Sequence, residues 1–162
     1  MTPLALNHTE GSIALAIAKY LECDKRLVIK NVKMEFLEAD LVYVSKLGYA
    51  GEVEIKKSKT DIRAEFDGHS LSKVCKHNGN ALGDRYVSYY SLAVPEGMEQ
   101  LALSLMPDKY GLFTVGERVT LIRKPVRLPN AKPITYEQLM ILSMYASRRF
   151  WQITEKGYSG RR

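Results

Sequence analysis

The chain has 162 residues, of which 46% are hydrophobic and 26% charged, a balance typical of a soluble globular domain. Its two cysteines, Cys23 and Cys75, are too few for a disulfide framework or a zinc ribbon. No apolar run reaches membrane-spanning length, and the N-terminus lacks the basic and apolar regions of a signal peptide. We therefore expect a cytoplasmic protein that does not enter a membrane.

The formal net charge of +6 and the pI of about 9.3 suit a nucleic-acid partner, because Lys and Arg side chains that neutralise phosphates release condensed counterions. The basic residues are grouped rather than evenly scattered. One group lies between residues 56 and 85, a second between 118 and 132, and a third between 148 and 162. A solvated charged face is the alternative interpretation of each group.

Residues 7–22 predict an amphipathic helix. Apolar residues recur at helical spacing from Ile13 to Leu21, and Glu10 falls on the same stripe. That position would turn the Glu10 carboxylate towards the rest of the fold. Alternatively, Asn7 and Glu10 form a capping box, in which Glu10 closes back on a backbone amide.

The stretch 37–58 predicts an antiparallel hairpin, since two β-type runs flank a polar connection that contains glycine. Side chains alternate along a strand, so Glu54 and Lys56 share one face and Asp40 can meet Glu54 across the ladder. Glu52 shares that face and competes with Glu54 for the role of metal ligand. Two close carboxylates suit a hard divalent cation, which can polarise a phosphodiester and lower the pKa of a bound water. Lys56 could orient that water or stabilise the negative charge that develops on phosphorus.

The residues of this hairpin resemble a known pattern. Ala39-Asp40, followed after a gap by Glu54-Ile55-Lys56, resembles the PD-(D/E)xK nuclease signature, with Ala39 where the signature has proline. The wider run, with Ser58, Asp61 and the segment 89–95, is similar to MmcB-type DNA-repair proteins of that superfamily. The resemblance covers residues 10–124.

The resemblance implies the restriction-endonuclease-like fold, an α/β sandwich with a central mixed sheet flanked by helices. It implies Asp40, Glu54 and Lys56 as catalytic residues and Mg²⁺ (or Mn²⁺) as the cofactor. Asp40 and Glu54 would bind the metal together with the backbone carbonyl of Ile55. Glu10 matches the first-helix glutamate that related nucleases use as a further metal ligand.

The segment after the hairpin predicts nucleic-acid contacts. Residues 58–61 are typical of a helix cap, and Asp61 is best explained by that cap alone. The polar, basic loop at 70–83 could lie along a substrate backbone. We expect six residues to contact the nucleic acid: Lys57, Ser58, Lys59, Arg63, Lys73 and Lys76.

The remaining patterns complete the element order: a helix, three strands, a short helix, a strand, a helix, two strands and a final helix. The elements outside the hairpin are expected as strands at 27–36, 85–94, 110–115 and 118–124 and helices at 96–105 and 136–154. Together with the resemblance, which implies a nuclease-like core at 1–124, this order predicts a proline-spaced linker at 125–133 and a C-terminal helix with a basic tail at 134–162. The C-terminal segment would pack on the core or on a second subunit, which makes the chain a candidate homodimer.

The sequence as a whole predicts a hydrolase: a magnesium-dependent deoxyribonuclease, and more specifically an endonuclease, of the DNA-repair or recombination type. Because phosphate contacts carry no sequence information and no base-reading motif is present, we expect structure-selective or sequence-tolerant cleavage of duplex, branched or single-stranded DNA. One alternative is a non-catalytic DNA-binding or scaffold module with a nuclease-like fold. Another is an RNA-directed nuclease.

Overall fold

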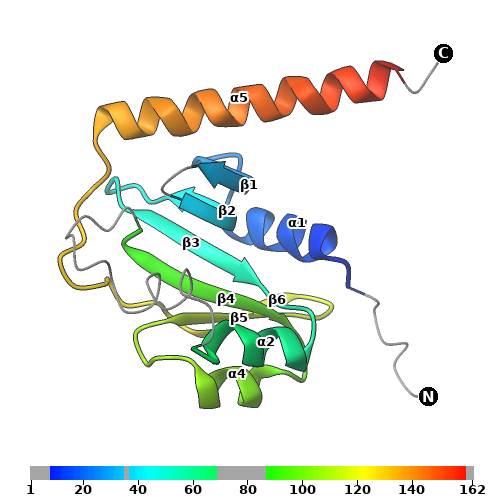
Figure 1. The fold of residues 1–162 in the computed structure, drawn as a ribbon, viewed down its shortest axis with the longest axis vertical. Helices are drawn as coiled ribbons and strands as arrows, with labels where there is room; N and C mark the ends of the chain where they lie inside the picture. The colour runs from blue at the N-terminus through cyan, green and yellow to red at the C-terminus, as the bar shows by residue number, and fades with distance from the viewer. Residues whose placement is uncertain (1–7, 35–36, 69–86, 160–162) are drawn as a thin grey trace.

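A computed structural model describes residues 8–34, 37–68 and 87–159 of the chain. The elements are arranged as Figure 1 shows. They are α1 (Glu10–Tyr20), β1 (Val28–Met34), β2 (Leu37–Val44), β3 (Ala50–Ile55), α2 (Lys59–Phe66), β4 (Tyr89–Pro95), α4 (Glu99–Leu105), β5 (Gly111–Val115), β6 (Val119–Arg123) and α5 (Tyr136–Ser159). Within the described residues the predicted element order is confirmed, and so is the α/β class with a mixed sheet between helices.

The six strands form one sheet in the order β1-β2-β3-β4-β5-β6. The pairs β1/β2, β2/β3 and β5/β6 are antiparallel, whereas β3/β4 and β4/β5 are parallel. The parallel pairs need crossover connections, and helices fit that requirement. The C-terminal end of β3 therefore lies near the middle of the sheet, next to the start of α2 (Figure 1).

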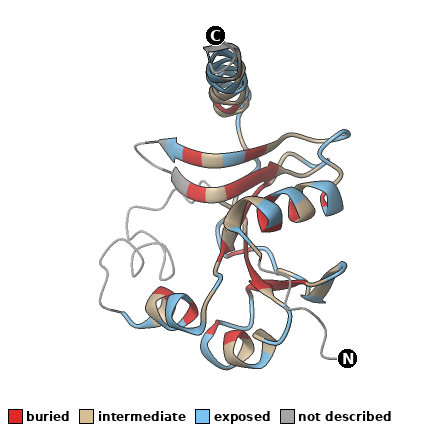
Figure 2. Ribbon diagram, turned by 90° about the vertical axis from the view of Figure 1, so that its right-hand side faces the viewer, coloured by how far each residue is buried: buried red, intermediate tan, exposed pale blue. Residues whose placement is uncertain are grey.

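Alternation along the strands gives the sheet two apolar faces. On one face α1 packs against odd-numbered residues of β2 and β3, such as Leu41 and Ile55. On the other face α2 and α4 cover a cluster that includes Tyr90 and Leu92. Buried positions therefore lie on both sides of the central strands (Figure 2). Glu54, whose neighbour Ile55 faces α1, belongs to the face that α2 covers.

The long helix α5 covers β1 and β2 at one edge of the sheet. Leu142 is fully buried in a cluster with Val32 and Val42. The Tyr145 hydroxyl donates to the carbonyl of Asn31 at 2.7 Å. Figure 1 shows that α5 continues beyond these strands, so its second half extends past the sheet. Tyr145 also accepts from the Lys33 backbone N–H, so α5 occupies backbone groups on β1, the edge strand of the sheet.

Several boundaries differ from those expected. The helix expected at 136–154 continues to Ser159, so the start of the expected basic tail is helical. The strand expected at 85–94 begins at Tyr89, and residues 85–86 lie outside the described ranges. The loop at 70–83 also lies outside them. Among the helices that the structure describes, none is both long and apolar enough to cross a bilayer.

Candidate active site

The candidate site lies where β2 and β3 separate. Their backbone pairing ends at Leu41 and Val53. Beyond that point the Asp40 side chain replaces the backbone as the hydrogen-bond partner of β3, because its Oδ2 accepts from the Ile55 backbone N–H at 2.7 Å. The N–H and C=O of one strand residue point to the same edge, so the Ile55 carbonyl also faces the β2 side. The hairpin thus brings Asp40 beside the end of β3, as the sequence predicts.

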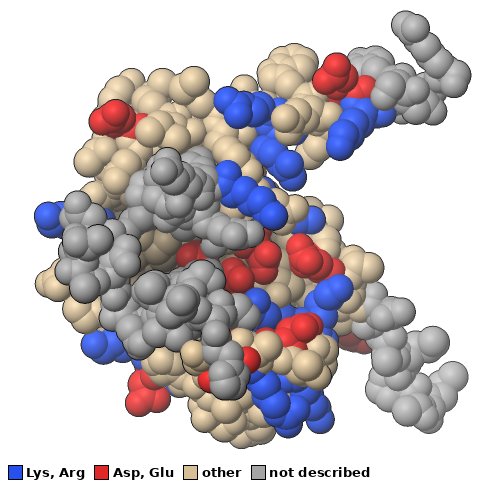
Figure 3. Space-filling view, in the orientation of Figure 1, with Lys and Arg blue, Asp and Glu red and all other residues tan. Residues whose placement is uncertain are grey.

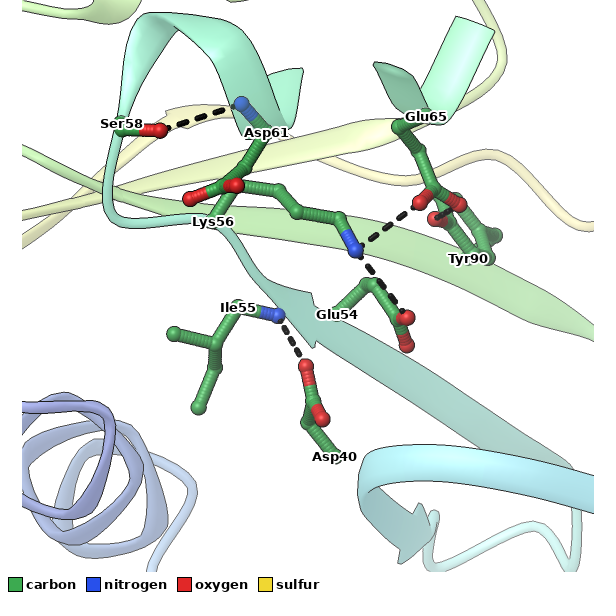
Figure 4. A network of polar contacts seen from close by, with 8 residues as sticks. All are labelled: Asp40, Glu54, Ile55, Lys56, Ser58, Asp61, Glu65 and Tyr90. Carbon is green, nitrogen blue, oxygen red and sulfur yellow. Dashed lines mark hydrogen bonds and ion pairs between the residues drawn. The ribbon is translucent and has the colours of Figure 1, made fainter.

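Glu54 and Lys56 lie on the face that α2 covers, and Figure 4 shows their side chains side by side. The Lys56 Nζ is 3.3 Å from Glu54 Oε1 and 2.8 Å from Glu65 Oε2. The three side chains are largely shielded, with 13%, 15% and 1% of their surfaces exposed for Lys56, Glu54 and Glu65. Lys56 is therefore held between two carboxylates in a partly dehydrated environment.

The partner that the sequence analysis missed is Glu65, which comes from α2. The Ser58 side chain caps this helix by accepting from the Asp61 backbone N–H at 3.1 Å, and Ile62 anchors the helix in the core. Glu65 is three residues after Ile62, so both share the inward side of the helix. Its Oε1 accepts from the Tyr90 hydroxyl at 3.1 Å, with Tyr90 itself buried. The sequence did contain a signal for Glu65: it is a carboxylate that falls on the apolar stripe of a helix whose Ser58 cap is clear.

A pocket of about 340 Å³ opens at this point. Its lining residues come from α1, β2, the end of β3 and α2: Glu10, Asp40, Glu54, Ile55, Lys56, Lys57, Asp61 and Ala64. Glu10 reaches it because the N-cap of α1 is Thr9, which accepts from Ser12 N–H. Glu10 is thus the first helical residue. The alternative of a capping box begun by Asn7, which lies outside the described residues, is not supported, because Thr9 is the N-cap. Asp61 was expected to serve only the helix cap. Its backbone N–H does donate to the Ser58 cap, but Asp61 also lines the pocket.

Burial and like charge act together on Asp40. Burial raises the pKa of its carboxyl, and the neighbouring Glu54 charge raises it further, to about 6 in total, against the opposing effects of the Ile55 N–H and Lys56. Glu10 adds a smaller effect in the same direction as Glu54, which shows that its charge reaches Asp40. For Lys56, burial disfavours the charged form, but Glu54 and Glu65 outweigh it and the pKa is raised. Lys56 therefore carries its charge at neutral pH.

All four predicted metal-ligating residues, Glu10, Asp40, Glu54 and Ile55, line this one pocket. Within residues 8–34, 37–68 and 87–159, however, no three His, Cys, Asp or Glu side chains stand close enough together to form a ready-made metal site. The metal assignment stays a prediction.

The predicted nucleic-acid contacts are distributed around the site. Lys57 lines the pocket and is exposed, while Ser58 serves as the cap of α2. Lys59 and Arg63 are exposed on α2 at a spacing of one turn. Lys73 and Lys76 lie outside the described residues. Three of the six expected residues are thus exposed and positively charged, and of these Lys57 lines the pocket while Lys59 and Arg63 lie on the outer part of α2.

No protein-family model and no curated protein matches the chain. A solved structure, described as "SPO1766 protein of unknown function from Silicibacter pomeroyi", is similar to it with a TM-score of 0.63 and 18% sequence identity. The match covers 94% of this chain and 96% of that chain. At this identity the similarity shows a shared fold over nearly the full length of both chains and nothing more.

Proposed function

We propose that this chain is a metal-dependent endonuclease with a restriction-endonuclease-like fold that hydrolyses phosphodiester bonds in DNA. One observation carries the proposal: Asp40, Glu54 and Lys56 meet at one pocket, where burial and mutual repulsion hold the pKa of Asp40 at about 6. Perturbed ionisable groups gathered in a pocket are a mark of functional sites. The similar solved structure has no known function and adds nothing on this point.

The chemistry of the donor set fits a magnesium or manganese ion. Asp40 and Glu54 offer carboxylate oxygens, Ile55 offers a carbonyl oxygen and Glu10 a further carboxylate, which are the hard ligands that these ions prefer. Asp40 and Glu54 repel each other across the pocket, and a cation between them would remove that repulsion. Such an ion, when bound, would polarise the phosphodiester and lower the pKa of an attacking water.

The side chains of the chain itself perform three tasks in this proposal. Above pH 6 Asp40 is ionised and can act as a ligand. Lys56 directs a permanent positive charge into the pocket, where it would stabilise the negative charge that develops on the phosphoryl oxygens. Glu65 is a positioning residue, because it keeps Lys56 charged and in place even when Glu54 is engaged elsewhere.

We propose DNA as the substrate because positive charge borders the pocket. Lys57 lines the pocket and Lys59 and Arg63 are exposed on α2, and all three would contact phosphates, as would Lys73 and Lys76. Such contacts do not read bases, so the proposed cleavage is sequence-tolerant or selective for DNA structure, as in repair or recombination. We assign this activity to the cytoplasm.

The test is cleavage of a labelled panel with Mg²⁺, Mn²⁺ or EDTA. The panel contains duplex, flap, four-way and single-stranded DNA with a matched RNA strand, and wild type is compared with Asp40→Asn. The proposal requires cleavage that depends on metal and is lost in Asp40→Asn. Binding without cleavage under every metal would instead favour a non-catalytic DNA-binding module. That second candidate is supported by the Lys56 ion pair with Glu54 and by the lack of a three-carboxylate cluster among the described residues.

A further inference from the structure

Basic side chains lie on both sides of the candidate site. Figure 3 shows acidic side chains in a hollow of this face, with Lys and Arg on the helix arm above it and on the elements below it. On the α2 side of the pocket, Lys57 lines the pocket, and Lys59 and Arg63 are exposed on α2 itself; these three residues are called the lower group. A nucleic-acid strand that followed this group alone would leave the upper group without a role.

The upper group is built in part by the second half of α5. Leu142, buried against β1 and β2, marks the side of α5 that faces the body of the protein. Arg149 and Lys156 follow it by seven and fourteen residues, so the three positions share one side of the helix. Past the last contact with the sheet, this side of α5 carries Arg149 and Lys156, with the exposed Ile153 between them. Glu155 lies on another side, roughly 140° from Leu142 at about 100° per residue.

Two lysines of β1 connect α5 to the pocket. The Lys33 backbone N–H donates to the Tyr145 hydroxyl at 3.1 Å, so Lys33 lies next to α5. The Lys30 Nζ lies at the first turn of α1, 3.5 Å from the point that a Cβ on Gly11 would occupy. Gly11 directly follows Glu10, which lines the pocket. The strand that α5 covers thus carries two lysines, and the Lys30 side chain reaches the first turn of α1 beside the pocket-lining Glu10.

We propose that this α5–β1 surface, formed by Lys30, Lys33, Arg149 and Lys156, binds the second backbone of a double-stranded nucleic acid. The inference rests on the proposed function, because it assigns the α2 side of the same pocket to the strand that is cut. A duplex presents two rows of phosphates separated by a groove of about 6–12 Å, and two cationic surfaces on opposite sides of one pocket match two rows. A single strand offers only one row. The substrate class that fits both surfaces is duplex DNA.

The test compares two neighbouring arginines on the same helix. Arg149→Gln removes a charge from the inward side of α5, whereas Arg148→Gln removes an identical charge roughly 120° from Leu142. Fluorescence anisotropy in EDTA gives the affinity for a labelled duplex and for one of its strands between 50 and 200 mM salt. We expect Arg149→Gln to weaken duplex binding about 5–10-fold at 0.1 M salt and to reduce the salt slope by about 0.9. The single-strand affinity and the Arg148→Gln variant should stay at wild-type levels.

Two results would overturn the inference. If Arg149→Gln and the double variant with Lys156→Gln bind duplex like wild type, this surface does not contact the backbone, and an acidic protein becomes the better partner for it. If duplex and single strand lose affinity equally, the surface does not read a second strand. Thermal unfolding of each variant controls for folding.

Failure of the proposed function has a different signature. If wild type binds duplex in the expected pattern but cuts nothing with any metal, the second-strand inference is supported and the nuclease proposal is refuted. If wild type cuts DNA while Arg149→Gln binds duplex like wild type, the nuclease proposal is supported and only the second-strand inference is refuted.

Discussion

Glu65→Gln is the perturbation that probes the candidate site most sharply. The variant keeps the size of the side chain and its ability to accept from Tyr90, but removes the negative charge 2.8 Å from the Lys56 Nζ. If Glu65 acts through Lys56, two quantities should change. The protein should lose stability, and Lys56 should lose its proton at a lower pH than in wild type, because one of the two carboxylates that raise its pKa is gone.

The size of the stability loss follows from the surroundings of Lys56. Removing one partner of a buried ion pair costs about 3–5 kcal/mol when the other charge is left uncompensated. Here Lys56 keeps Glu54 at 3.3 Å, so its charge remains compensated. We therefore expect the smaller cost of a hydrogen bond to a charged group, about 1.5–3 kcal/mol.

The assay is a double-mutant cycle in urea with wild type, Glu65→Gln, Lys56→Met and the double variant. A coupling energy of about 1–3 kcal/mol is expected, and additivity within about 0.5 kcal/mol would refute the reasoning. Glu52→Gln is the matched control. Glu52 is buried on the same face of β3, with 2% of its surface exposed; it is not among the main effects on the pKa of Lys56, although its charge acts on Tyr90. Its coupling to Lys56→Met should therefore be smaller than that of Glu65→Gln.

Three further outcomes are expected. The pKa of Asp40 is about 6 in the folded protein against the usual 3.8, so ionisation of Asp40 at pH 7.5 destabilises the fold. In urea unfolding, Asp40→Asn should stabilise the metal-free protein by about 1–3 kcal/mol at pH 7.5 and should leave its stability unchanged at pH 3.5. A loss of stability at pH 7.5 would contradict this expectation. For the same reason, Mn²⁺ affinity measured by calorimetry should fall about tenfold per pH unit below pH 6, whereas a flat profile would exclude Asp40 as a ligand. Tyr145→Phe removes the hydrogen bonds of the hydroxyl with Asn31 and Lys33, so the free energy of unfolding should fall by about 1–3 kcal/mol and amide exchange in α5 should become faster. Unchanged exchange would show that these bonds do not hold the helix in place.

Local patterns predicted much of this molecule from the sequence. The order of helices and strands follows from hydrophobic periodicity, and the hairpin register follows from alternation around Gly48 and Gly51. The register is what brings Asp40 beside the end of β3. The sequence did not indicate that pairing would stop at Leu41 and Val53, which lets the Asp40 carboxylate reach the Ile55 N–H.

Contacts between distant segments account for what was missed. The role of Glu65 depends on how α2 packs over β4, where Tyr90 meets it, and periodicity within one helix does not specify its neighbours. The same limit applies to Lys30 and Lys33. Their proposed role depends on α5 packing over β1 and on the Lys30 side chain reaching α1, which are contacts between segments far apart in the sequence.

The central claim is that Lys56 and the carboxylates beside it cut phosphodiester bonds. Its most direct test is the single-turnover rate of duplex DNA cleavage by wild type and Lys56→Ala, prepared in parallel and assayed with Mg²⁺ or EDTA. The account predicts metal-dependent cleavage by wild type and a loss of about 10²-fold or more in Lys56→Ala, with little change in DNA affinity. Equal rates for the two proteins, or cleavage that persists in EDTA, would contradict it.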